Sequence, residues 1–168
     1  MRPITIFLAA ALVVSAAIAA ADRDDDESQL SEKDLQNAKV SLEDGLKSSE
    51  AQGTPISAKY EVEKGNLQLS VYTMKGGAFA ELIVDHKSGK VIKTEAITEG
   101  EDLKAAQEQS AAMAKAKDSL RVSVGHAVAA NKGFRAVSAV PAMENGHPVA
   151  KIVLRKGKES RAVAQKLD

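Results

Sequence analysis

The chain of 168 residues contains no cysteine and no tryptophan. Without cysteine it can form no disulfide bond, thiolate nucleophile or cysteine-ligated metal site, so its stability must come from packing. Aromatic residues are also scarce, with three Phe and two Tyr. We therefore expect no large aromatic-lined pocket for a sugar or a nucleic-acid base.

An excess of charge of either sign is missing as well. Lys and Arg together number 23, Asp and Glu together number 23, and the formal net charge is zero. Proteins that bind nucleic acid or an anionic membrane surface usually carry a clustered basic excess. The charge balance therefore predicts neither kind of partner.

The first residues have the pattern of a secretory signal peptide. Arg2 precedes an uncharged apolar run, Ile4 to Ile18, which is too short and too rich in Ala to span a bilayer comfortably. Small residues provide A-x-A cleavage sites ending at Ala19 or Ala21. We expect residues 1–21 to be removed, leaving a periplasmic or secreted protein without a membrane span. An uncleaved membrane anchor is the less favoured alternative.

A strongly acidic run, Asp22 to Glu27, opens the segment 22–30 that follows. Hard cations such as Ca²⁺ are bound by several carboxylate oxygens, so this run could chelate calcium loosely. It lacks the glycine and the alternating ligand spacing of a calcium-binding loop. Dense charge of one sign favours a solvated, disordered tail over residues 22–30.

The remaining chain is similar to itself. The stretch VSLEDGLKSSEAQG, residues 40–53, is echoed by VSVGHAVAANKG, residues 122–133. In each copy a Val is followed by a Ser that could cap a helix, then by apolar residues at helical spacing and a Gly suited to a helix C-terminus. We expect one helix in each copy, capped by Ser41 and by Ser123.

Strands follow each predicted helix. Apolar residues alternate with polar ones at Leu67, Leu69 and Val71, and apolar residues recur at every second position at Ala150, Ile152 and Leu154. This period of two indicates strands with one buried face. Short Gly-containing segments separate the strands and predict tight turns: EKGN, KGG, HKSG, ENGH and RKGK.

These patterns predict an α+β protein of two tandem units, each a helix packed on an antiparallel meander of three to four strands. The units should cover residues 31–98 and 119–168. The second has no counterpart of the strand 90–97, so its sheet should have one strand fewer or borrow an edge. Residues 99–118 are rich in Ala and predict a mostly solvated connector helix beside the second unit's helix. A flexible tether is the alternative.

The first half resembles the PepSY domain. PepSY domains typically end in an apolar residue, Val and Asp, then turn residues, then Gly-Lys-Val, and this chain has Val84, Asp85, Gly89, Lys90 and Val91. The resemblance covers about residues 40–97 closely and the second half from residue 122 more loosely, because the second half lacks this hairpin. It implies an exported module that binds rather than cleaves and that restrains a secreted or envelope peptidase.

Candidate binding residues lie in two predicted turns: Asp85, His86, Gly89, Lys90, Asn145 and Gly146. A structural role is favoured for the first turn, because Asp85 can accept hydrogen bonds from turn amides and Gly89 can adopt a positive φ. The alternative function is a periplasmic sensor of a small ligand or metal ion, using Asp85, His86 and the acidic tail.

Catalytic patterns are not found. His86, His126 and His147 show no metal-binding spacing, and no nucleophile motif is present. We therefore predict a non-enzymatic protein with no catalytic residue, metal or cofactor. The expected partner is a protein or peptide of the cell envelope, with a peptidase as the candidate. We expect an extended peptide to add as a strand to an unpaired edge at Arg161 to Leu167.

Overall fold

The computed structural model describes residues 30–168, and both the predicted signal peptide and the acidic run lie outside the described residues. In chain order the elements are α2 (Glu32–Asn37), α3 (Leu42–Ser49), β1 (Thr54–Glu63), β2 (Asn66–Lys75), β3 (Ala78–Val84), β4 (Val91–Ile97), α4 (Gly100–Met113), α5 (Leu120–Ala130), β5 (Arg135–Glu144), β6 (His147–Lys156) and β7 (Glu159–Lys166). Leu30, which the predicted tail included, is 3% exposed and belongs to the core. No helix within the described range is long and apolar enough to cross a membrane.

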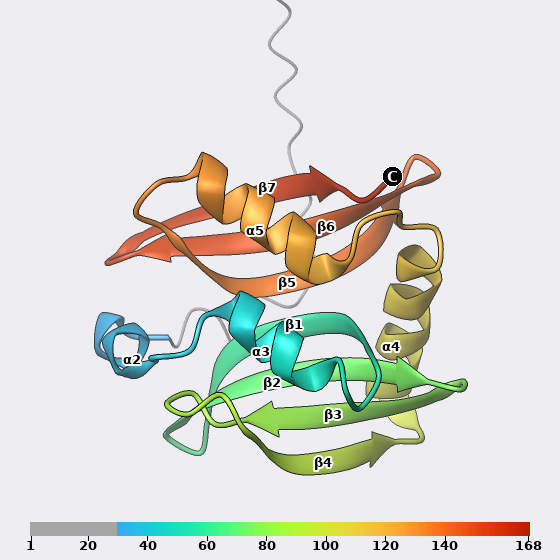
Figure 1. Ribbon diagram of the computed structural model, residues 1–168, viewed down its shortest axis with the longest axis horizontal. Coiled ribbons are helices and arrows are strands. Elements are labelled where there is room, and N and C mark those ends of the chain that lie inside the picture. Colours follow the sequence, from blue (N-terminus) through green and yellow to red (C-terminus); the bar gives the residue numbers. More distant parts are fainter. Residues whose placement is uncertain (1–29) are drawn as a thin grey trace, which may run out of the picture.

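All seven strands belong to one antiparallel sheet with the order β4-β3-β2-β1-β5-β6-β7 (Figure 1). The two halves of the chain meet at its centre, where β1 pairs with β5 through Ala58 opposite Ala139 and Lys59 opposite Ser138. The prediction of two tandem helix-on-meander units is therefore wrong. The architecture is a single sheet with helices on its faces.

A shared core is the physical reason for this correction. One cluster of buried apolar side chains takes members from α3, α5 and the central strands of both halves. Helices α3 and α5 lie side by side on the same face of the sheet (Figure 1). Neither half encloses its own apolar surface, and burying that surface requires the continuous sheet.

Within this one sheet the order of strands recurs. The strands β5, β6 and β7 each begin 81 residues after β1, β2 and β3. The local geometry recurs with them, since a register shift lies between Pro55 and Ser57 in β1 and between Ala136 and Ser138 in β5. Within residues 30–168, no strand corresponding to β4 lies on the outer side of β7.

The two faces of the sheet are covered differently. On the helix face, the buried Tyr60 donates a hydrogen bond of 2.6 Å from its hydroxyl to the carbonyl of Val40, just before α3. On the opposite face, which α4 crosses and which we call the open face, Ser57 donates a hydrogen bond of 2.8 Å to Oε1 of Gln109. Ser57 and Tyr60 are an odd number of residues apart in β1, so their side chains point to opposite faces.

The predicted connector helix differs from its expectation. Helix α4 forms where the connector helix was predicted, and seven of its 14 residues are exposed. It packs across β1 and β5 rather than beside α5, with Ala106, Gln109 and Ala112 buried. The predicted cap of the second helix was also wrong. Ser119 caps α5 by accepting a hydrogen bond from the amide of Val122, whereas Ser123 is buried inside the helix.

Candidate functional site

The turn that joins β3 to β4 contains four of the predicted binding residues. Its backbone closes through two hydrogen bonds of 2.8 Å, from the amide of Asp85 to the carbonyl of Lys90 and from the amide of Gly89 to the carbonyl of Asp85. The Asp85 carboxylate accepts a hydrogen bond of 2.7 Å from the Ser88 amide. The hydrogen bonds from Ser88 lower the pKa of Asp85. Gly89 has a φ of 73°.

The same turn supports the segment that leads into α3. The carbonyl of His86 accepts hydrogen bonds from the amides of Lys39 and Val40, at 2.8 and 3.0 Å. Gly89 also faces the side chain of Val40. These contacts give the turn a structural role, the one that the residue pattern favoured.

The other two candidates, Asn145 and Gly146, form the turn between β5 and β6, with φ values of 50° and 84°. Lys64 and Gly65 form the matching turn between β1 and β2, with φ values of 50° and 79°. The structure does not bring the two groups of candidates together, because the turn at residues 85–90 lies at the entry to α3 and the turn at 145–146 lies at another corner of the sheet (Figure 1).

The three histidines also lie apart from one another. His86 lies in the turn described above, His126 is exposed on α5, and His147 lies at the start of β6. Nδ1 of His147 is 2.6 Å from Oδ2 of Asp168, and this hydrogen bond lowers the pKa of Asp168. Residues 30–168 contain no group of three or more His, Asp or Glu side chains that could hold a metal ion.

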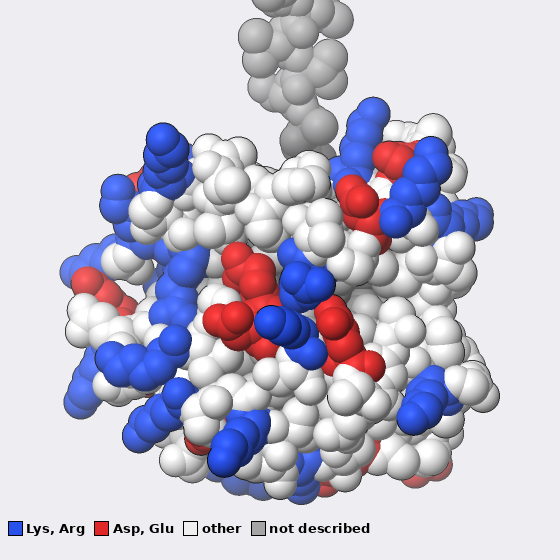
Figure 2. All heavy atoms as spheres, in the orientation of Figure 1, with Lys and Arg blue, Asp and Glu red and all other residues white. Residues whose placement is uncertain are grey.

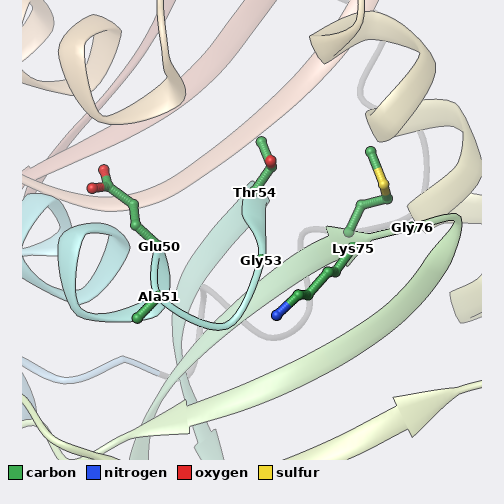
Figure 3. Close-up of a pocket in the computed structure, with 7 residues that line it drawn as sticks. Glu50, Ala51, Gly53, Thr54, Lys75 and Gly76 are labelled. Atoms are coloured by element: carbon green, nitrogen blue, oxygen red, sulfur yellow. The ribbon is translucent and has the colours of Figure 1, made fainter.

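A shallow depression of about 310 Å³ lies between the start of β1 and the turn after β2 (Figure 3). Its lining residues are Glu50, Ala51, Gly53, Thr54, Met74, Lys75 and Gly76. The carboxylate of Glu50 is already paired with Arg121 at 2.9 Å. Glu50 and Lys75 do not point toward each other (Figure 3). The depression therefore lacks the converging polar groups of a small-molecule site.

A network that sequence reasoning missed lies on the open face. We call it the polar cluster, and it consists of Lys59, Glu61, Gln68, Ser70, Tyr72 and Glu81. Ser70 donates a hydrogen bond of 2.6 Å to Glu61, and Lys59 forms an ion pair of 2.6 Å with the same carboxylate. Gln68 donates a hydrogen bond of 2.9 Å to Ser70. The cluster spans β1, β2 and β3.

Partial burial governs the electrostatics of the polar cluster. Desolvation raises the pKa of Glu81, although a hydrogen bond with Ser70 opposes the effect. Burial also raises the pKa of Tyr72, and the nearby Glu81 and Glu61 carboxylates raise it further. The period-two alternation of polar residues could have placed these side chains on one face, but their contacts depend on the register between strands.

Strand β7 forms one edge of the sheet. It pairs with β6 from Lys156 opposite Glu159 to Val149 opposite Lys166, with no register shift. Among the described residues no strand lies on its outer side. The edge ends at Leu167, whose carbonyl accepts hydrogen bonds from the amides of Lys117 and Asp118 at 2.6 and 3.2 Å.

Strand β4 forms the opposite edge and is more irregular. Its pairing with β3 has a register shift between Ile83 and Val84. It carries a Lys93–Glu95 ion pair at 2.9 Å and Ile92, which is 65% exposed. Bulges and charges are features by which sheet edges resist further pairing.

No protein-family model, curated protein or solved structure matches this chain. The resemblance to PepSY domains consequently rests on the residue pattern, chiefly over residues 40–97, and stays a prediction. The geometry of the sheet and its edges therefore carries the functional proposal.

Proposed function

We propose that the protein is a non-enzymatic binding module that holds an extended segment of a partner protein against β7. The observation that best supports this proposal is that β7 and β3 occupy the same position in the two halves of the sheet. The outer side of β3 is covered by β4. A partner strand beside β7 would take the place that β4 takes beside β3.

The backbone of β7 offers a regular set of hydrogen-bonding groups to such a strand. Only two residues, Gly157 and Lys158, separate β6 from β7, so the pair flanking the turn exchanges hydrogen bonds. In an antiparallel ladder the pairs then alternate, which turns the amide and carbonyl groups of every second residue outward. The outward residues of β7 are Ser160, Ala162, Ala164 and Lys166.

Few features of β7 oppose pairing on its outer side. Its residues 162–165 are Ala, Val, Ala and Gln, without charge or proline. Natural edge strands are usually protected by charges, proline or bulges, and β4 has both charges and a register shift. The charged residues of β7 lie towards its ends, at Glu159, Arg161 and Lys166, and its pairing with β6 has no shift. This regular middle section supports strand addition, in which the main chain supplies affinity and neighbouring side chains supply selectivity.

The PepSY resemblance makes a secreted or envelope peptidase the partner class of this proposal. Capture of an extended segment of the peptidase would restrain it without any chemistry by the binding module. The alternative of a metal or small-ligand sensor gains no support from residues 30–168, where the predicted candidates are separated and Asp85 is engaged within its own turn.

A displayed library of random twelve-residue peptides, selected against the full chain, tests the proposal. Ala162→Pro is the decisive variant, because it removes an outward amide while leaving the ladder to β6 intact. Ala162→Thr, which keeps the amide, is the matched control. Selected peptides should bind the wild-type chain and the Thr variant, bind the Pro variant at least tenfold more weakly, and slow amide exchange at Ala162 and Ala164.

Binding that is indifferent to Ala162→Pro, or amide protection at another part of the sheet, would overturn the proposal. So would a selection that enriches no peptide. Circular dichroism and the urea midpoint of the Pro variant establish whether its fold is retained.

A further inference from the structure

The β7 edge has an electrostatic character that the neutral net charge conceals. Four basic residues gather where β7 begins, and we call them the basic cluster: Lys132, Lys156, Lys158 and Arg161. Arg161 lies 4.1 Å from the ring centre of Phe134 and Lys156 lies 5.9 Å from it. The side chain of Lys156 also lies against Gly133, next to Lys132.

Acidic side chains balance this cluster only in part. Glu159 forms an ion pair of 2.7 Å with Arg161, and Glu32 lies close to Gly157 in the turn. Basic side chains predominate along the flank of the molecule that carries α2 and the β6–β7 turn (Figures 1 and 2). The end of the edge at which β7 begins is therefore positively charged.

Arg161 is the member of the basic cluster that a partner strand would meet directly. It lies opposite Leu154, a core residue, so its side chain is on the helix face of the sheet. There its guanidinium donates a hydrogen bond of 3.3 Å to Asn131 at the end of α5. Arg161 is exposed, so a strand added to β7 would place a residue beside it.

We propose, building on the function above, that the partner segment runs antiparallel to β7 and places an acidic side chain opposite Arg161. The orientation follows from β4, which runs antiparallel to β3. The acidic side chain follows from charge complementarity, because directly opposed opposite charges stabilise a strand pair and like charges destabilise it. The partner is thus an extended acidic segment of a protein.

The chain itself supplies a probe with a defined register. In β4, Ala96 lies opposite Ala80, and Arg161 is the residue 81 positions after Ala80. A capped peptide of residues 90–99 should place its Ala96 opposite Arg161, and the same peptide with Ala96→Glu should place a carboxylate there. A third peptide with Ala96→Lys is the matched control.

The three peptides are titrated into the full chain while the amide resonances of Ala162 and Ala164 are followed by NMR. The Glu peptide should bind about threefold more tightly than the parent and the Lys peptide about threefold more weakly, the effect expected of one cross-strand charge pair. In Arg161→Glu protein the order of the two charged peptides should reverse. High salt should reduce the difference.

The outcomes separate this inference from the function on which it rests. Equal affinities for the three peptides, with Ala162→Pro still abolishing binding, would overturn the acidic preference and leave strand addition at β7 intact. Failure of every peptide to bind, or resonance shifts confined to β4, would overturn both. A dimer that Ala162→Pro dissolves would assign the edge to a second copy of the chain and overturn the acidic partner.

Discussion

The two halves of the sheet match through their third strand and then diverge. In the first half, β3 is followed by the turn at residues 85–90 and by β4, which covers it. In the second half, no strand of the described residues lies on the outer side of β7. The comparison shows that a strand fits stereochemically on the outer side of β3, the position that β7 takes in the second half.

A second difference lies on the open face. Glu81 on β3 belongs to the polar cluster, whereas the matching residue of β7 is Ala162. The first half therefore joins its strands through charged and polar side chains on this face. On the same face, the middle of β7 carries the small, uncharged side chains of Ala162 and Ala164. The same strand order thus places a polar network on the open face of the first half and small side chains at the matching positions of the second.

The strongest test of the shared core removes matching side chains from the two halves. Val71 and Ile152 occupy equivalent positions and are 0% and 1% exposed. Val71→Ala and Ile152→Ala should each lower the free energy of unfolding by about 2–4 kcal/mol, because both leave cavities in one cluster. Urea denaturation followed by circular dichroism should show one transition for each variant. Two transitions, with each substitution shifting only one, would contradict a shared core.

A smaller loss is expected from the contact that ties the start of β5 to the first half. The guanidinium of Arg135 donates hydrogen bonds to the carbonyls of Leu35, Ala38 and Val40, at 2.6, 3.0 and 2.9 Å. It also lies over the ring of Tyr60, 5.6 Å from its centre. Arg135→Met should lower the free energy of unfolding by about 2–3 kcal/mol, since it removes three hydrogen bonds from a charged donor. The carbonyl of Val40 keeps its hydrogen bond from Tyr60, whereas those of Leu35 and Ala38 lose the guanidinium.

Arg121→Met is the matched control for the loss of the Arg135 hydrogen bonds. The Arg121–Glu50 ion pair also joins the two halves, but its side chains are 41% and 43% exposed. Its loss should lower the free energy of unfolding by less than about 1 kcal/mol, because exposed ion pairs contribute little. The midpoints of urea denaturation give both values. Equal losses from the two variants would show that burial of the Arg135 contact does not matter.

Local features of the fold could be predicted from sequence. The glycine-containing turns are confirmed, with positive φ at Gly65, Gly76, Gly89, Gly146 and Gly157. The alternation at Leu67, Leu69 and Val71 correctly predicted a strand, but not a single buried face, because Ser70 on the opposite face is 0% exposed. Such features depend on residues close in the chain, whose steric preferences are visible in a short window.

The joining of the halves could not be predicted in the same way. It depends on pairing between Ala58 and Ala139, which are far apart in sequence. Nothing in the residues around either one indicates that the two strands pair. One signal was available: residues 136–140 are all uncharged, and four of them are buried. A strand buried on both faces is typical of the middle of a sheet, which β5 occupies.

The candidate site, likewise, could be predicted from sequence only in part. The edge at Arg161 to Leu167 was predicted from the missing counterpart of β4, and among the strands of residues 30–168 β7 lies at the end of the sheet. The polar cluster was missed because Glu61, Ser70 and Glu81 come from three strands. Their contacts follow from register, which a one-residue slip would destroy by turning each side chain to the other face.

A substitution of glycine by alanine should have opposite effects in the two matching helices. A Cβ at Gly45 in α3 would lie 2.6 Å from Cδ2 of Leu69, whereas a Cβ at Gly125 in α5 would meet nothing within 4 Å. Gly125→Ala should raise the free energy of unfolding by about 0.5–1 kcal/mol through helix propensity. Gly45→Ala should lower it by about 1–2 kcal/mol, because overpacking outweighs that gain.

Thermal unfolding of both glycine variants, monitored by circular dichroism, measures these changes. Leu69→Val combined with Gly45→Ala is the control for the clash, since a shorter side chain makes room for the added methyl group. Stabilisation of similar size by Gly45→Ala and Gly125→Ala would mean that α3 does not pack as closely on β2 as the structure shows.

The smallest expected effect concerns the polar cluster, which only the first half possesses. Desolvation raises the pKa of Glu81 in the folded chain above its ordinary value of 4.5. A raised pKa in the folded chain means that folding favours the protonated form of Glu81. The contribution of this group to the free energy of unfolding is therefore full below pH 4.5 and is lost as the pH rises through the folded-state pKa. Glu81→Gln should therefore raise the free energy of unfolding at pH 7, by less than about 1 kcal/mol because the group is partly solvated. It should also make stability less dependent on pH above 4.5. Urea midpoints measured from pH 4 to pH 8 test both effects, and an unchanged slope would show that Glu81 titrates alike in the folded and unfolded chains.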